Sequence, residues 1–258
     1  MNPIAIRLLN QQLIAPRYSK PTEVVRYMGA MQAQEYRMMR WAVAMRTRKP
    51  SHKAFKQAYD EGKIIRLHLM RGTWQLVCAE DYWSMIDLFA PKAIAVTKGW
   101  MSSNKISIPD DELIGVRDIL IQTAADKRSV TKEDFVLALT ERNQQMDDHR
   151  LSYHIRMAEL TGVLCSGDLL PMKATYALAA DKVKSSVKME RDEALAQLYE
   201  EVLPKSPTSH IGGFRLVVRI EHQLQVTRHR APSRTPASCP QRQRHFPPRH
   251  RLQWNYLR

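Results

Sequence analysis

Two glutamines, Gln32 and Gln34, are separated by a single alanine at the expected joint between two helices. On a helix their side chains would point about 200° apart and could not reach one small target. In an extended joint both side chains lie on one side, and Ala33 faces the interior. The two amides could then orient one polar molecule by hydrogen bonds, although neither can act as a base at neutral pH. The spacing also fits an alternative in which both are ordinary helix residues.

Short helices followed by a β-hairpin are expected around this pair. Pro21 and Ser51 stand at helix starts, and apolar residues recur at helical spacing after each of them. Residues 63–77 alternate between apolar and polar types instead, and Gly72 interrupts them, which predicts a hairpin. This order is typical of a winged helix, in which a helix and its hairpin contact DNA. The helices are expected at residues 4–13, 21–31, 35–46 and 51–62.

The same order returns downstream. Thr131 and Asp134 form a capping-box pattern at the start of one helix, and Asp147 or Asp148 starts the next. Residues 164–178 then read as a strand, a turn and a strand. The two modules share almost no sequence identity, so the repeat lies in the architecture.

These patterns predict the fold class and the domains. We expect a mainly α fold with small β-hairpins, an α+β class, built of tandem winged-helix domains. The first module would occupy residues 1–124, including a helical connector from about residue 79. The second would occupy residues 125–205, and residues 206–258 would form an irregular tail rich in arginine and proline.

Composition excludes several classes of protein. The apolar content of 44% and the charged content of 26% are ordinary for a globular protein. Since no apolar run approaches the roughly 18 residues of a membrane helix, we expect no membrane contact and a cytoplasmic protein. Cys78, Cys165 and Cys239 are scattered, which predicts neither a disulfide framework nor a zinc site. No metal or other cofactor is expected.

The formal net charge of +14 predicts a polyanionic partner. Residues 211–258 hold ten arginines, no lysine and a single acid, Glu221, and so carry +9 of that charge. The remaining +5 leaves the body of the chain only modestly basic.

Three separated stretches resemble the AlkZ-like, YcaQ-related family of winged-helix DNA glycosylases. They are "PTEVVRYMGAMQAQEY", "IIRLHLMRGTWQLVCAEDYWSMIDLFAP", and "RMAELTGVLCSG" followed by "KATYAL". Family members have three tandem winged-helix domains around DNA, and their catalytic signature is a glutamine, an apolar residue and a second glutamine. That signature falls on Gln32, Ala33 and Gln34. In the YcaQ-like branch the last position tends to be aspartate, so this chain is more similar to the AlkZ side.

The resemblance implies hydrolysis of the N-glycosidic bond of alkylated purines in DNA repair. A purine alkylated at N7 is already cationic and leaves without a strong acid, so a positioned water and electron-rich oxygens suffice. Gln34 would orient the water, and Gln32 would share it or support the cationic sugar. The expected partner is double-stranded DNA that is alkylated or crosslinked, bound by a monomer associated with the nucleoid. The alternatives are a non-enzymatic winged-helix transcriptional regulator and a truncated remnant with neither activity.

The basic residues of both modules are candidates for DNA contact. On the first hairpin they are Arg66, His68 and Arg71, for which the alternative is a solvated strand face, and Trp74 is expected in the core. The second module offers Arg150 and Arg156 on its second helix and Lys173 on its hairpin, where a solvated charged surface is the alternative. His154 has no partner at metal-ligand spacing. Core positions are expected at Met157, Leu164 and Tyr176.

The tail has two readings. In the family a third module opens with a segment resembling Trp-Trp-Ser-Gly-Leu, whereas this chain reads "FRLVVRIEHQ" from Phe214. Suitable codons shifted by one nucleotide would turn residues 216–223 into that segment, which favours a C-terminal third that is truncated or out of frame. The chain would then keep its glutamine pair without a third module and could be inactive. A natural basic arm is the other reading.

Overall fold

The computed structural model of the chain describes residues 2–184 and 191–202, with the side chains of Arg71 and of residues 197–202 left out. The described residues belong to one compact unit. The predicted tail, residues 206–258, lies outside the described residues.

The first part of the chain contains helices followed by a hairpin, as expected. Strand β3 pairs antiparallel with both β1 and β2, in the order β1-β3-β2. Helix α4 starts at Ser51, whose side chain accepts a hydrogen bond from the Ala54 amide at 3.1 Å. The elements are α1 (Pro3–Asn10), α2 (Pro21–Met28), β1 (Met31–Gln32), α3 (Met39–Ala44), α4 (His52–Asp60), β2 (Ile64–His68) and β3 (Trp74–Cys78).

The second part repeats this order and strand topology. Its sheet has the order β4-β6-β5, again with the hairpin's last strand in the centre. The predicted capping box is present, with the Thr131 amide donating to Asp134 at 2.7 Å, and Asp147 caps the next helix. The elements are α6 (Asp110–Ala124), β4 (Val130–Thr131), α7 (Lys132–Glu141), α8 (Asp148–Leu160), β5 (Leu164–Ser166) and β6 (Thr175–Leu178).

In each part, a glycine in the left-handed conformation ends the helix that precedes the hairpin. Gly62 has a φ of +73° and Gly162 a φ of +71°, and the first hairpin strand starts two residues after each of them. A side chain at Gly62 would also meet the Lys182 carbonyl oxygen, because a Cβ there would lie 2.7 Å from it. Glycine is required at this helix end both for its backbone conformation and for the close approach of α9 (Ala179–Lys182).

Three apolar clusters form the core. One is built from α2, α3, α4 and the first sheet, and another from α6, α7, α8 and the second sheet. The third joins the two parts, because α5 (Tyr82–Ser103) and β2 pack there with Cys165 of β5 and with α10 (Arg191–Val202). Helix α6 fills the second cluster, whereas the predicted boundary at residue 124 places α6 in the first domain.

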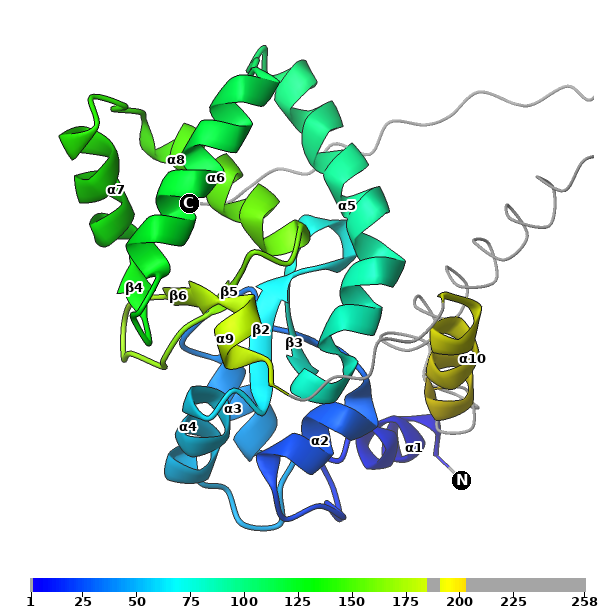
Figure 1. Ribbon diagram of the computed structural model, residues 1–258. Helices are drawn as coiled ribbons and strands as arrows, with labels where there is room; N and C mark the ends of the chain where they lie inside the picture. Colours follow the sequence, from blue (N-terminus) through cyan, green and yellow to red (C-terminus); the bar gives the residue numbers. More distant parts are fainter. Residues whose placement is uncertain (1, 185–190, 203–258) are drawn as a thin grey trace, which may run out of the picture. The chain divides into compact units, whose positions relative to one another are not determined.

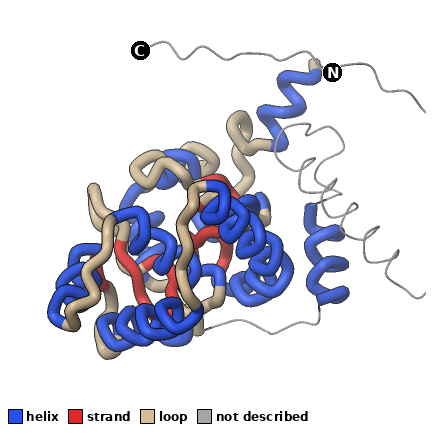
Figure 2. Tube along the Cα trace, turned by 90° about the horizontal axis from the view of Figure 1, so that it is seen from above, coloured by secondary structure: helices blue, strands red, loops and turns tan. Residues whose placement is uncertain are grey.

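The two hairpins lie side by side. In Figure 1 strand β5 lies beside β2, and α5 runs along the first hairpin. Figure 2 shows the strands close together among the surrounding helices. The Arg66 amide of β2 donates to the Ser166 hydroxyl of β5 at 2.9 Å, so the sheets also meet through a buried hydrogen bond.

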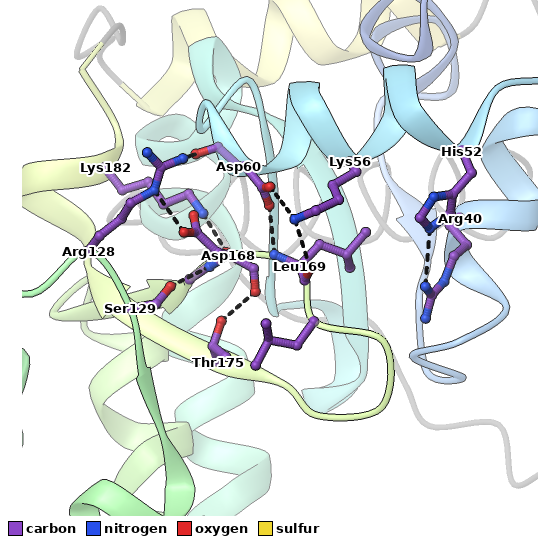
Figure 3. A network of polar contacts seen from close by, with 12 residues as sticks. Arg40, His52, Lys56, Asp60, Arg128, Ser129, Asp168, Leu169, Thr175 and Lys182 are labelled. Atoms are coloured by element: carbon purple, nitrogen blue, oxygen red, sulfur yellow. Dashed lines mark hydrogen bonds and ion pairs between the residues drawn. The ribbon is translucent and has the colours of Figure 1, made fainter.

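The loop between β5 and β6, residues 167–174, is held against the first part of the chain. Lys56 of α4 donates to the Leu169 carbonyl at 3.0 Å, and Asp60 accepts from the Leu169 amide at 2.7 Å (Figure 3). Arg128 forms an ion pair with Asp168 at 2.7 Å. Leu169 itself is 2% exposed and belongs to the apolar cluster of the first part. The loop is therefore a structural bridge between the two parts.

We predict that Leu169→Ala lowers the free energy of unfolding of the full chain by about 2–5 kcal/mol, since it leaves a cavity in the first cluster. Leu170→Ala is the matched control, because Leu170 is 39% exposed and offers only its carbonyl to Tyr36. Urea unfolding followed by circular dichroism measures both. Equal losses in the two variants would contradict the bridging role of Leu169.

Candidate functional site

Gln32 and Gln34 lie in an extended segment, so the alternative in which both are ordinary helix residues is wrong. Met31 and Gln32 pair with Leu76 and Gln75 of β3, and the Ala33 amide continues the ladder to the Trp74 carbonyl at 2.8 Å. Ala33 is buried, while Gln32 and Gln34 are exposed. The prediction that both amides lie on one side, with Ala33 facing the interior, is therefore confirmed.

The Gln34 side chain has a fixed acceptor position. Its Oε1 accepts a hydrogen bond from the Trp74 amide at 3.4 Å, where the strand ladder has ended. An amide oxygen has two lone pairs, so a second acceptor site remains for a water molecule. The contact is long and exposed. It orients the carboxamide without exhausting its hydrogen-bonding capacity.

Arg66 supports this segment from the interior. Its Nε donates to the Ala33 carbonyl at 3.0 Å, and its guanidinium lies 3.7 Å from the ring centroid of Trp74 and 5.3 Å from that of Tyr36. Arg66 is only 4% exposed, and no carboxylate of a described residue lies within ion-pair distance. Burial lowers its pKa below the usual arginine value, yet the group remains charged. Aromatic faces therefore take the place of an acidic partner.

The expected exposure of the first hairpin strand is wrong for Arg66 and His68. His68 is 5% exposed, its Nδ1 contacts the Glu159 carboxylate of α8, and its ring lies 3.6 Å from the Trp74 ring. Both the DNA-contact and the solvated-face readings needed exposed side chains. The second part of the chain covers this strand face, so Arg66 and His68 position other residues instead of reaching a docked duplex.

Two of the remaining DNA-contact candidates are already paired with carboxylates. Arg150 pairs with Glu112, with its Nε 2.6 Å from that carboxylate, and Lys173 pairs with Glu133 at 3.0 Å. Arg156 is half-buried, and its Nε has no hydrogen-bond partner among the described residues. The side chain of Arg71 lies outside the described atoms. Arg150 and Lys173 thus already carry an acidic partner, which weakens them as phosphate ligands.

The predicted core positions are largely found. Leu164 and Tyr176 are buried, and Trp74 is half-buried between two apolar clusters. Met157 is only partly buried, because it lines a cavity of about 460 Å³ between the end of α5, the following loop and α6. The lining residues of that cavity lie on other elements than the glutamine pair.

A basic, partly apolar surface next to the pair was missed from the sequence. Residues 36–59 contain seven lysines and arginines and no acid. On α3 and the turn before it, Met38, Trp41 and Met45 are exposed. A charge count over this window would have found the surface, whereas the count over the whole chain was dominated by the tail.

The described residues contain no cluster of three or more histidine, cysteine or acidic side chains that could hold a metal ion. Cys78 and Cys165 are buried free thiols. Among residues 2–184 and 191–202, no helix has the length and apolarity to cross a membrane.

Comparison with known proteins identifies the family. A family model described as "DNA glycosylase AlkZ-like" matches residues 25–205, and the chain therefore belongs to the AlkZ-like DNA glycosylase family. Among solved structures, the fold is similar to that of the DNA glycosylase AlkZ from Streptomyces sahachiroi, with a TM-score of 0.60 and 18% identity. The match covers 79% of this chain and 56% of that protein. A search of curated protein sequences finds no match.

Arg66→Met is expected to lower the free energy of unfolding by about 1–3 kcal/mol, because the buried Ala33 carbonyl loses its donor. Arg37→Met on the exposed side of the same region should change it by less than about 0.5 kcal/mol. Chemical denaturation of the full chain compares them. Unchanged stability in Arg66→Met would show that the guanidinium does not hold the segment.

Acid should loosen the contact between α6 and α8. The bond from Arg150 lowers the pKa of Glu112, so the stabilisation from Glu112 is present at neutral pH and is lost as pH falls through that lowered pKa. Burial lowers the pKa of His154 in the folded state. The unfolded chain therefore takes up a proton at this residue more readily, and the folded state loses stability once the pH drops below about 6.5. In Glu112→Gln we expect lower stability at pH 7 and a smaller further loss toward pH 3. Thermal melts across this range test it, with the exposed Glu141→Gln as control.

Proposed function

We propose that the protein is a DNA glycosylase that hydrolyses the N-glycosidic bond of alkylated purines. The observation that carries the proposal is the exposed, same-sided pair of Gln32 and Gln34, fixed by the strand ladder at Ala33 and by the buried Arg66. Such preorganised amides can position a nucleophile without paying for reorganisation during the reaction.

The two repeated parts act, in this proposal, as winged-helix modules. Each has a helix, a short strand, two helices and a hairpin, with the last strand central in its sheet. In this proposal the second module includes α6, because α6 packs in the apolar cluster of that module. Family membership and the acid-free segment 36–59 support double-stranded DNA as the partner.

The reaction follows from the charge of the substrate. N7-alkylguanine is cationic, so breaking the bond to C1′ releases a neutral base and leaves positive charge on the sugar. A water molecule oriented by the Gln34 oxygen adds to C1′ and gives its proton to solvent. The oxygen of Gln32 shares that water or faces the cationic sugar. The products are the free base and an abasic site.

A sequence-reading regulator is less well supported, because the elements that would read DNA are engaged elsewhere. Helix α8 has buried residues around much of its surface, including His154 and Glu159. The loop 167–174 is held on the first module through Lys56 and Asp60. Neither is free to enter a major groove as recognition helix and wing do.

The tail after residue 205 stands where the family has its third module. The family match ends at residue 205, and the tail after it lies outside the described residues. We propose that the tail is out of frame, and genomic codons that cannot yield the Trp-Trp-Ser-Gly-Leu segment would contradict this.

Gln34→Ala should lower release of N7-methylguanine from methylated duplex DNA by about 100-fold, by analogy with removal of one positioning group in other active sites. Gln32→Ala should also lower it, while Gln57→Ala, an exposed glutamine of α4, should not. Chromatography of the released base gives the rates.

The assay is run on this chain and on a frame-corrected version. Release only by the corrected version supports both the glycosylase and the frame proposals. Absence of release in both, together with tight binding to one intact sequence, would favour the regulator.

A further inference from the structure

The region after the glutamine pair exposes large apolar side chains on one face. Met38, Trp41 and Met45 follow each other at intervals of three and four residues, which places them on the same side of α3. Trp41 is 65% exposed. We call these three residues the α3 face. A tryptophan this exposed beside two methionines is unusual for a surface that meets only water.

The segment that carries the α3 face also exposes several cations. Arg37, Arg48, Lys49 and Lys53 are exposed, and none forms an ion pair with a described carboxylate. The exposed aromatic group with uncompensated cations is the combination that nucleic-acid surfaces use, with cations on phosphates and rings on bases. A protein partner would have to supply acidic groups around an apolar centre, whereas every DNA duplex has anionic phosphates around stacked bases.

The α3 face starts one turn after the pair. The amides of Met38 and Met39 both donate to the Glu35 carbonyl at 3.0 Å, so the helical path begins directly behind Gln34. Trp41 follows Gln34 by seven residues, which at about 1.5 Å per residue is a rise of about 10 Å, or about three base-pair steps. A duplex that runs along α3 with its damaged nucleotide at the glutamines would therefore bring neighbouring bases to Trp41.

The loop 167–174 holds α3 in this position. Tyr36 donates to the Leu170 carbonyl at 3.1 Å, and Arg40 donates to the Pro171 carbonyl at 2.8 Å. In Figure 3 Arg40 also lies against His52 of α4, 3.2 Å away. The backbone under the α3 face is thus tied to the second module and to α4, so Trp41 projects from a supported helix.

We propose that Trp41 stacks on a base of the DNA next to the damaged nucleotide and stabilises the locally unstacked duplex. Unstacking costs free energy at the lesion, and an aromatic side chain that replaces the lost base contact offsets it. Met38 and Met45 flank the ring with adaptable apolar surface. Trp41 contributes to DNA binding in this proposal, and the two glutamines remain the groups that act on the glycosidic bond. The inference rests on the proposed function.

The test measures binding of the full chain to a labelled duplex containing a tetrahydrofuran abasic-site analogue and to the same intact duplex. Trp41→Ala should weaken binding to the analogue duplex by about tenfold, the scale of one aromatic stacking contact, and weaken intact-duplex binding less. Trp41→Phe should retain most of the affinity. Trp100→Ala is the matched control, because Trp100 of α5 is 49% exposed and lies outside the segment.

A second readout is independent of affinity. Addition of the analogue duplex should quench tryptophan fluorescence in the wild type and in Trp100→Phe, and the quench should be clearly smaller in Trp41→Phe. Wild-type affinity in Trp41→Ala, or equal losses in Trp41→Ala and Trp100→Ala, would overturn the proposal. A dimer that becomes monomeric in Trp41→Ala would also overturn it, since the α3 face would then be a protein interface.

The stacking role of Trp41 and the glycosylase function can be contradicted by different results. Binding uses an analogue with no base to release, so the binding test does not depend on base release, and Gln57→Ala should bind the analogue like the wild type. Base release with normal binding by Trp41→Ala would remove only the stacking role. Binding that depends on Trp41, without base release even in the frame-corrected chain, would remove only the glycosylase proposal.

Discussion

The hydrogen bond from the buried Arg66 to the Ala33 carbonyl is the constraint on which the candidate site depends. It fixes the one residue between the two glutamines, and Arg66 is itself fixed by Ser166 of the second module and by the rings of Trp74 and Tyr36. Because a buried cation without an acidic partner is costly, it is tolerated only where aromatic faces and a carbonyl surround it. The backbone that carries the two exposed amides is thus held by packing on the opposite side of the strand.

Contacts of the same kind hold the two modules firmly together. His68 contacts Glu159 across the interface, and the loop 167–174 places Leu169 in the first module's core. Helix α8, strand β2 and the loop 167–174 therefore hold the modules together, whereas an isolated winged helix would present such elements to DNA. In the proposed function, the surface available to DNA lies on the first module, where residues 36–59 carry seven cations and no acid.

Much of the local structure could be predicted, because its causes are local. Pro21, Ser51, Thr131 with Asp134, and Asp147 mark helix starts in the structure as they do in the sequence. The extended joint at the glutamines was one of two interpretations of their spacing, and the structure decided between them. The alternating strand Ile64–His68 was correct as a strand, yet its polar side chains were misplaced, since both of its faces are covered.

The sequence by itself determined the order of elements and the resemblance to the AlkZ-like family, and it offered the same-sided placement of Gln32 and Gln34 as one of two interpretations. Only the tertiary structure decided that Arg66 and His68 are interior supports, that Arg150 and Lys173 are already paired, and that the α3 face is open. The physical reason is the distance along the sequence over which each effect acts. Caps, turns and alternation act within a few residues, whereas burial of a charged side chain depends on segments about a hundred residues away, such as Ser166 opposite Arg66.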